Sequence, residues 1–145
     1  MIVHRFIGLS ELEALVTDGI VRPLEESGRK CLFFWDSDKH DCPSYQLEYL
    51  TGIVGEIKSD KTEWRRFFCL VSCDIPDEML KKKYMTYADP YGDWYDTMVE
   101  DELHLFGEYK KEEVKCVRLY VDDRMGFKEY KSFDTIGDAY RFLTE

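Results

Sequence analysis

The first residues of the chain show the hydrophobic and polar pattern of a β-strand. The segment Ile2–Ile7 is apolar except for two consecutive polar residues, His4 and Arg5. Because successive side chains of a strand point to opposite faces of the sheet, the pattern predicts that His4 and Arg5 lie on different faces. A shift of the pairing register by one residue would exchange the two, so the sequence leaves open which of them faces a functional site.

A short helix is predicted directly after this strand. Ser10 and Glu13 have the spacing of a capping box, and Gly19 is a typical signal for the end of a helix. We therefore expect a helix from about residue 11 to residue 18. The apolar positions that follow helical spacing in this segment are Leu12, Leu15 and Val16.

The middle of the chain is predicted to contain two strands with a helix between them. Residues 31–35 are apolar and aromatic throughout, which is typical of a buried strand, and a polar turn over residues 36–41 follows them. Pro43 suits the first turn of a helix, which we expect to end near residue 51 or 52. Residues 64–73 are again rich in apolar side chains and predict the next strand.

The segment after this strand contains strong breakers of regular structure. After Pro76 the pattern favours a short helix over residues 77–83. Residues 84–95 hold four tyrosines together with Pro90 and Gly92, so they predict a loop crowded with aromatic side chains.

The last third of the chain is predicted to be mostly strand. Residues 99–106 alternate in their second half, and residues 107–113 fit a turn or a helical crossing. Residues 114–121 predict a further strand, beside which residues 127–130 can pair. A C-terminal helix is predicted to begin at Asp134.

The mixed order of these elements predicts the α+β class, with mainly antiparallel sheets and short helices. The length of 145 residues favours a single domain over residues 1–145, and a content of 44% hydrophobic and 15% aromatic residues excludes a disordered tail. No apolar run approaches the roughly 20 residues that a membrane-spanning helix needs, and the first residues lack the pattern of a signal peptide. We therefore expect a soluble, cytoplasmic protein without a membrane partner.

The charge of the chain limits the classes of partner that it can bind. Thirty acidic residues against twenty Lys and Arg give a formal net charge of −10. Such a surface repels nucleic-acid phosphates, so direct nucleic-acid binding is not expected. The acids fit two interpretations: they keep an aromatic-rich domain soluble, or they present negative charge to a basic protein partner.

The cysteines predict neither a disulfide framework nor a metal site. Their odd number and wide spacing are not those of a disulfide-rich fold. Cys69 and Cys73 lie four residues apart on a predicted strand, so they share one face and fit buried thiols. His40 and Cys42 would supply only half of a zinc site, and we expect no metal. The five cysteines are Cys31, Cys42, Cys69, Cys73 and Cys116.

Three motifs follow one another along the chain. The first is Val3-His4-Arg5-Phe6, the second is residues 31–37 followed by the helix with Tyr45, and the third is Glu100-Asp101-Glu102. By their order and spacing they resemble the motifs of the ADP-ribosyltransferase-like fold. Residues 110–117 resemble the stretch that follows the third motif. In that family an Arg or His on the first strand contacts the ribose and amide side of NAD. A middle strand supplies Ser or Tyr, and a late strand carries a [Gln/Glu]-x-Glu pair.

The resemblance implies an enzyme whose substrate is NAD. Glu102 would stabilise the oxocarbenium-like state that forms when the nicotinamide–ribose bond breaks, and Glu100 would position or deprotonate the acceptor. If residues 99–106 form a strand, Glu100 and Glu102 share a face with His104. Arg5 or His4 would bind ribose or phosphate oxygens. Ser37 and Tyr45 complete the cofactor-binding residues that the resemblance implies.

The same residues also fit structural roles, which keeps other functions open. Arg5 can pair with an acid, His4 can be a hydrogen-bonded structural histidine, and the two glutamates can be a solvated strand face. The chain also departs from the family, since Phe6 stands where a Gly often follows the first-strand residue. The alternatives are a non-catalytic acidic interaction or inhibitor protein, of a size that suits a phage or mobile-element accessory, and a pocket that binds an NAD-derived ligand without cleaving it.

Overall fold

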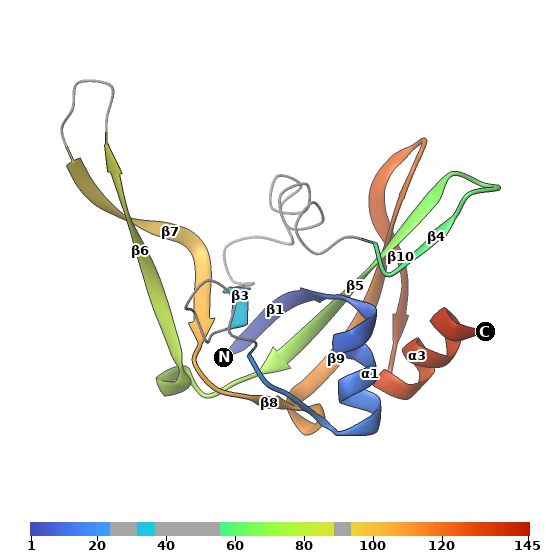
Figure 1. The fold of residues 1–145 in the computed structure, drawn as a ribbon, viewed down its shortest axis with the longest axis horizontal. Helices are drawn as coiled ribbons and strands as arrows, with labels where there is room; N and C mark the ends of the chain where they lie inside the picture. The colour runs from blue at the N-terminus through green and yellow to red at the C-terminus, as the bar shows by residue number, and fades with distance from the viewer. Residues whose placement is uncertain (24–31, 37–55, 89–93) are drawn as a thin grey trace.

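A computed structural model describes residues 1–23, 32–36, 56–88 and 94–145 (Figure 1). In chain order the elements are β1 (Ile2–Ile7), α1 (Leu9–Thr17), β2 (Ile20–Val21), β3 (Leu32–Asp36), β4 (Lys58–Asp60), β5 (Arg65–Asp74), the 3-10 helix η1 (Asp77–Met79), β6 (Leu80–Ala88), β7 (Trp94–Leu105), β8 (Tyr109–Lys110), the 3-10 helix η2 (Lys111–Glu113), β9 (Val114–Asp123), β10 (Gly126–Phe133) and α3 (Ile136–Thr144).

One large antiparallel sheet dominates the described chain. Its strands lie in the order β10-β9-β5-β1-β3-β7-β6, with β4 paired to β5, and every pairing is antiparallel. A second sheet consists of the short strands β2 and β8. The predicted α+β class with mainly antiparallel pairing and short helices is confirmed. The first strand of the chain lies in the interior of the sheet, between β3 and β5.

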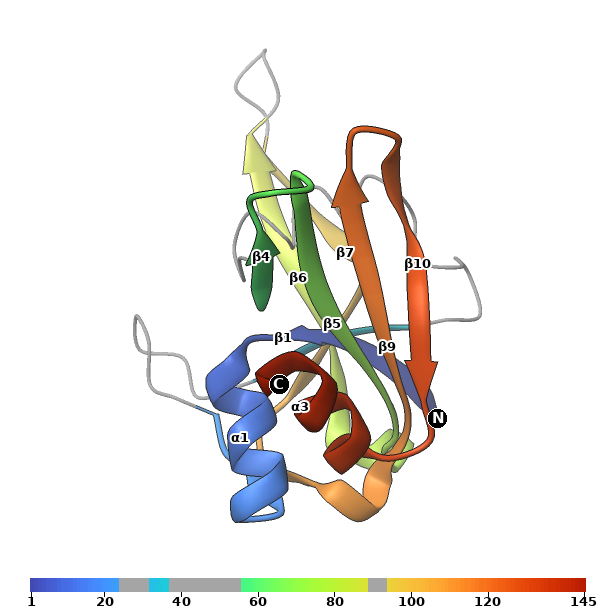
Figure 2. The same cartoon turned by 90° about the vertical axis from the view of Figure 1, so that its right-hand side faces the viewer.

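The two faces of the sheet carry different hydrophobic clusters. Helices α1 and α3 lie side by side on one face (Figure 2). Their apolar residues pack there with alternate positions of the strands, because strand side chains alternate between faces. This main core includes Val3, Ile7, Leu12, Leu15, Cys69, Val71, Val117, Leu119, Ala139 and Leu143. The other face carries the smaller cluster Phe6, Trp35, Phe68, Leu70 and Tyr120.

Helices α1 and α3 begin within two residues of the predicted positions, and α1 also ends close to the predicted one, but the start of α1 differs in detail. The capping box of Ser10 and Glu13 is wrong, because Gly8 is the N-cap, its backbone is extended, and no side chain caps the helix. Gly19 is confirmed as the stop: it has a φ of +73°, and its N–H donates to the Ala14 carbonyl at 3.0 Å. At α3, Thr135 Oγ1 accepts a hydrogen bond from the N–H of Asp138 at 3.1 Å.

The predictions for residues 77–95 are the main error in the fold. The predicted helix over 77–83 is only the 3-10 turn η1, and the predicted loop over 84–95 is largely the strands β6 and β7. Tyrosine, threonine and tryptophan favour strands, and here they pair across a ribbon that leans away from the rest of the sheet (Figure 1). The breakers Pro90 and Gly92 lie outside the described residues.

The remaining sequence predictions concern strands, which are confirmed, a turn or helical crossing, and segments that lie outside the described residues. The strands predicted over residues 2–7, 31–35, 64–73, 99–106, 114–121 and 127–130 are present, with ends that differ by up to five residues. Residues 107–113 contain β8 and η2, which partly fits the predicted turn or helical crossing. The predicted turn from residue 37 onward and the helix from residue 43 to 52 lie outside the described residues.

Candidate functional site

The centre of the large sheet brings four positions of four strands into one row. Ser72 of β5 pairs with His4 of β1, His4 pairs with Trp35 of β3, and Trp35 pairs with Glu102 of β7. Neighbouring strands lie about 4.8 Å apart, so the backbones of His4 and Glu102 are separated by roughly 10 Å. The pairing therefore brings the first-strand motif close to the late acidic motif, although about one hundred residues separate them in sequence.

His4 is fixed in this row by its neighbours on both sides. Its side chain is buried, and its Nδ1 shares a hydrogen bond of 2.7 Å with Ser72 Oγ. On the other side, the ring centroids of His4 and Trp35 lie 5.6 Å apart. The hydrogen bond at Nδ1 orients the imidazole ring and constrains which of its nitrogens can carry the proton.

Trp35 contributes a hydrogen-bond donor that the described protein does not use. Its side chain is only 3% exposed and also packs against Phe6, with ring centroids 5.5 Å apart. The indole Nε1 is buried and has no hydrogen-bond partner among the described residues. A buried donor without an acceptor costs about 1–3 kcal/mol, so native proteins rarely keep one without a reason. A ligand oxygen would satisfy this donor.

Arg5 lies on the opposite face of the sheet, next to the helices. Its Nε and Nη2 donate to the two carboxylate oxygens of Glu11 at 2.9 and 2.8 Å, and Tyr109 Oη donates to Glu11 Oε2 at 2.7 Å. Helix α1 supplies Glu11 from its first turn. This Arg5–Glu11–Tyr109 network joins β1, α1 and β8, and it engages the guanidinium with a carboxylate on the helix side of the sheet.

Burial and the carboxylate of Glu11 decide the ionisation of this network. Burial alone lowers the pKa of Arg5, but the hydrogen bonds and the negative charge of Glu11 outweigh it and raise that pKa above its ordinary value. Burial, followed by the charge of Glu11, raises the pKa of Tyr109 well above its ordinary value. Tyr109 is therefore a protonated donor at any physiological pH.

The acidic pair lies in an irregular part of β7. The register joins Lys82 to Leu103 and Tyr84 to Met98, so one residue of β6 faces four residues of β7, numbers 99–102. Bulges of this kind redirect side chains and occur often beside active sites. The strand bends along this part of the ribbon (Figure 1). Both Glu100 and Glu102 belong to these four residues.

His104 follows the acidic pair on β7 and is buried. It pairs with residue 33 of β3, next to the row of His4 and Trp35, and its ring centroid lies 6.1 Å from that of Phe106. The predicted site residues Ser37 and Tyr45 lie outside the described residues. The structure therefore brings together His4 and the backbone of Glu102, and it separates both from the guanidinium of Arg5.

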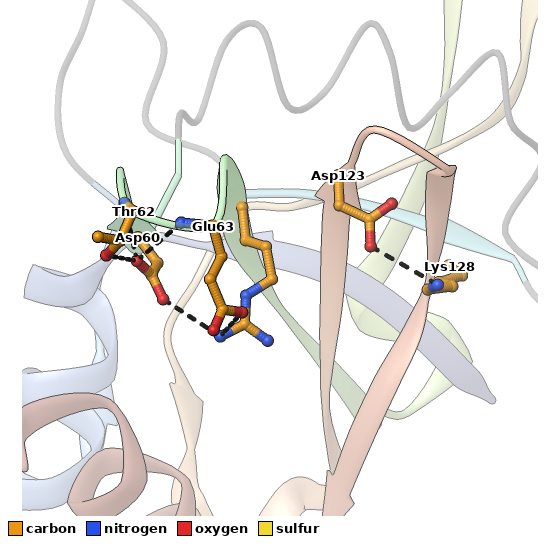
Figure 3. A network of polar contacts seen from close by, with 6 residues as sticks. Asp60, Thr62, Glu63, Asp123 and Lys128 are labelled. Atoms are coloured by element: carbon orange, nitrogen blue, oxygen red, sulfur yellow. Dashed lines mark hydrogen bonds and ion pairs between the residues drawn. The ribbon is translucent and has the colours of Figure 1, made fainter.

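Two surface depressions lie away from this row. One, of about 430 Å³, is lined by residues of the β4–β5 and β9–β10 hairpins, and Figure 3 shows polar contacts beside it. The other, of about 360 Å³, lies between α1 and the start of α3. Neither is lined by His4, Trp35 or Arg5. Within the described residues no group of three His, Cys, Asp or Glu is arranged to hold a metal ion, and no helix has the length and apolarity to cross a bilayer.

Several residues of this arrangement have a weak signal in the sequence. Ser72 is the one hydroxyl residue in the apolar segment from residue 67 to 73, but its contact with His4 depends on the pairing of β1 with β5. Glu11 lies six residues after Arg5, and a strand followed at once by a returning helix can bring two such residues together. Whether the indole N–H of Trp35 finds an acceptor among the described residues depends on tertiary packing, and no sequence pattern indicates it.

Comparison with known proteins gives no family for this chain. No protein-family model matches it, and no curated protein or solved structure is significantly similar to it. The fold defines the class, an α+β protein built on a mainly antiparallel sheet.

Proposed function

We propose that this protein is an ADP-ribosyltransferase-like enzyme that cleaves NAD and transfers ADP-ribose to a macromolecular acceptor. The observation that carries the proposal is the row of paired positions His4, Trp35 and Glu102. Such an enzyme needs a polar donor on the first strand and a carboxylate on a late strand, both within reach of one sugar. Two strand spacings, roughly 10 Å, match the size of a ribosyl group with its contacts.

His4, rather than Arg5, is the first-strand residue in this proposal. His4 occupies the row of Glu102, whereas the guanidinium of Arg5 is bound to Glu11 on the opposite face. His4 and the indole N–H of Trp35 would donate hydrogen bonds to oxygen atoms of the substrate. Arg5 then stabilises the fold through the Arg5–Glu11–Tyr109 network. Ser37 and Tyr45 remain substrate-binding residues that are predicted from the sequence resemblance.

The proposed reaction exchanges one bond at the anomeric carbon of the ribose. The bond from C1′ to the nicotinamide nitrogen breaks, and its electron pair leaves with the ring, which turns the pyridinium into neutral nicotinamide. The ribose becomes oxocarbenium-like, and the carboxylate of Glu102 stabilises this positive charge. An oxygen or nitrogen atom of the acceptor forms the new bond to C1′ and loses its proton to Glu100. If water is the acceptor, the product is free ADP-ribose.

The test is NAD binding and turnover by the wild type and three variants. We expect NAD to raise the thermal midpoint of the wild type and labelled ADP-ribose to be released or transferred. Glu102→Gln should reduce turnover by about 100-fold or more while the protein stays folded, because it removes charge stabilisation of the transition state. Trp35→Phe keeps an aromatic ring without the N–H, and it should raise the KM for NAD more than it lowers kcat. Glu112→Gln, at an exposed position of η2, is the matched control and should behave as wild type.

Two results would overturn the proposal. One is the absence of both NAD binding and turnover in folded wild-type protein. The other is full turnover in Glu102→Gln. The first result, combined with salt-sensitive binding of a basic protein such as a histone, would favour the alternative acidic interaction protein, which the net charge of −10 supports.

A further inference from the structure

The tip of the β4–β5 hairpin holds a large aromatic residue in an unfavourable backbone conformation. Trp64 has a φ of +57°, in the left-handed region, and its side chain is 68% exposed. Glycine or asparagine is usual in such a position, and a bulky residue there is strained. Burial does not compensate for this strain, because most of the Trp64 ring contacts solvent. An exposed, strained aromatic residue is a candidate for function.

The hairpin around Trp64 is held in a defined shape. Asp60 Oδ1 accepts hydrogen bonds from the N–H and the hydroxyl of Thr62, at 3.1 and 2.7 Å (Figure 3). Arg65 Nη2 lies 3.2 Å from Asp60 and 2.9 Å from Glu63. The hydrogen bonds from Thr62 and Arg65 lower the pKa of Asp60, so its carboxylate stays charged at neutral pH. These contacts fix the direction in which Trp64 is presented.

The neighbouring β9–β10 hairpin adds two residues to the same surface. The guanidinium carbon of Arg124 lies 5.4 Å from the centroid of the Trp64 ring, and Met125 is 86% exposed. Asp123 holds this turn, because its Oδ1 accepts from the N–H of Met125 at 2.7 Å and its Oδ2 lies 3.6 Å from Lys128 Nζ (Figure 3). We call Trp64, Arg124 and Met125 the hairpin-tip surface.

The charges around the hairpin-tip surface balance one another, although the chain as a whole is strongly acidic. Most acids here bind a cation within the described chain: Asp60 and Glu63 bind Arg65, Asp122 binds Arg66, and Asp123 binds Lys128. In the described part of the chain, Lys61 and Arg124 form no ion pair, and of the acids that line the adjoining 430 Å³ depression only Glu56 forms none. The five acids and five cations named here cancel, in contrast to the net charge of −10 of the protein, and Arg124 has no acidic partner among the described residues.

We infer that the hairpin-tip surface docks a segment of a partner protein that presents a carboxylate next to an aromatic or aliphatic side chain. Trp, Arg and Met are the residue types that are enriched at the centres of protein interfaces. The apolar group of the partner would pack on Trp64 and Met125, and its carboxylate would pair with Arg124. A surface of two hairpin tips is smaller than a standard interface, so we expect a transient complex with a micromolar Kd.

A nucleic acid is the other class of partner that an exposed Trp–Arg pair can bind. Bases stack on tryptophan, and arginine binds phosphate. The acids that surround these cations and the net charge of −10 oppose a polyanion, so the observations favour a protein segment. This inference does not depend on NAD turnover, because the hairpin-tip surface is built from other residues than the row of His4 and Glu102.

The test is a selection of peptides on the intact protein, followed by binding measurements on variants. A phage-displayed library of random peptides is selected on the wild type after depletion on Trp64→Gly. Glycine accepts the positive φ, so Trp64→Gly removes the ring and relieves the strain, and its thermal midpoint should equal or exceed that of the wild type. Arg124→Glu reverses the charge without touching the hairpin hydrogen bonds. Phe106→Ala is the matched control, because Phe106 is 57% exposed and Lys81 Nζ lies 5.6 Å from its ring centroid.

We expect enriched peptides to carry Asp or Glu within two positions of an aromatic or aliphatic residue. Synthetic copies should lose at least about 10-fold in affinity on Trp64→Gly and on Arg124→Glu, and none on Phe106→Ala. The inference is overturned if no peptide is enriched, if the enriched peptides are basic, or if they bind Trp64→Gly as well as the wild type. Trp64-dependent binding of a single-stranded oligouridylate, without such peptides, would also overturn it.

Discussion

The Arg5–Glu11–Tyr109 network gives a sharp prediction about stability. Replacing Glu11 by Gln removes the negative charge that Glu11 presents to the guanidinium of Arg5, while the shape of the Glu11 side chain is kept. The side chains of Arg5 and Glu11 are 19% and 13% exposed, so the pair is mostly removed from water. Tyr109 Oη would also lose a charged acceptor at 2.7 Å.

The expected size of this effect follows from the burial of the pair. Removing one partner of a fully buried ion pair costs about 3–5 kcal/mol. Partial exposure and the remaining amide oxygen of Gln reduce the loss, so we expect Glu11→Gln to lower the free energy of unfolding by about 2–3 kcal/mol. With a typical urea dependence for a small domain, the unfolding midpoint should fall by roughly 1 M.

The assay is urea unfolding followed by tryptophan fluorescence, with a control on the same helix. Glu13→Gln is that control, because Glu13 is exposed and its carboxylate accepts, within the described residues, only a long hydrogen bond of 3.4 Å from Tyr140 Oη. It should change the free energy of unfolding by less than about 0.5 kcal/mol. Equal midpoints for the two variants would refute the structural role of the network. The NAD turnover of folded Glu11→Gln should match the wild type, since Arg5 lies on the opposite face from His4.

Three further outcomes follow from buried thiols and from one turn. Burial raises the pKa of both the Cys69 and the Cys73 thiols to about 12, so neither should react with an aromatic disulfide reagent at pH 8 until urea unfolds the protein. The unfolded thiols ionise near pH 9.0, whereas the folded protein keeps these protons up to about pH 12. Stability should therefore be unaffected by these groups below pH 9 and fall above it by about 1.4 kcal/mol per pH unit and thiol, as urea midpoints at pH 8, 9 and 10 would show. Gly19→Ala should lower the free energy of unfolding by about 1–2 kcal/mol because of the positive φ, and Gly19→Asn by less; similar midpoints for both would contradict the left-handed turn.

The sequence was most informative where a local pattern decides the structure. The apolar strands follow from the spacing of hydrophobic residues, and the turn at Gly19 follows from the backbone preference of glycine. Both signals act within a few residues. The errors have non-local causes. Ser10 lies inside α1 because the chain leaves β1 at Gly8, and residues 84–88 form a strand because β7 pairs with them. In the second case, local preference yields to strand pairing.

The candidate site could be predicted only as a set of residue types. The alternation of His4 and Arg5 places them on different faces, but the choice between the faces depends on which strands pair with β1. The pairing with β3 and the packing of α1 make that choice, since Trp35 lies beside His4 and Glu11 lies beside Arg5. Neither contact can be predicted from the spacing of hydrophobic residues or from the composition of the chain.

The position of β1 between β3 and β5 has a consequence for how the protein folds during synthesis. The His4–Ser72 contact spans 68 residues, so β1 leaves the ribosome well before β5, which is one of its two neighbours in the sheet. Closing so long a loop is slow, and until then the apolar side chains of β1 stay accessible to chaperones or to other chains.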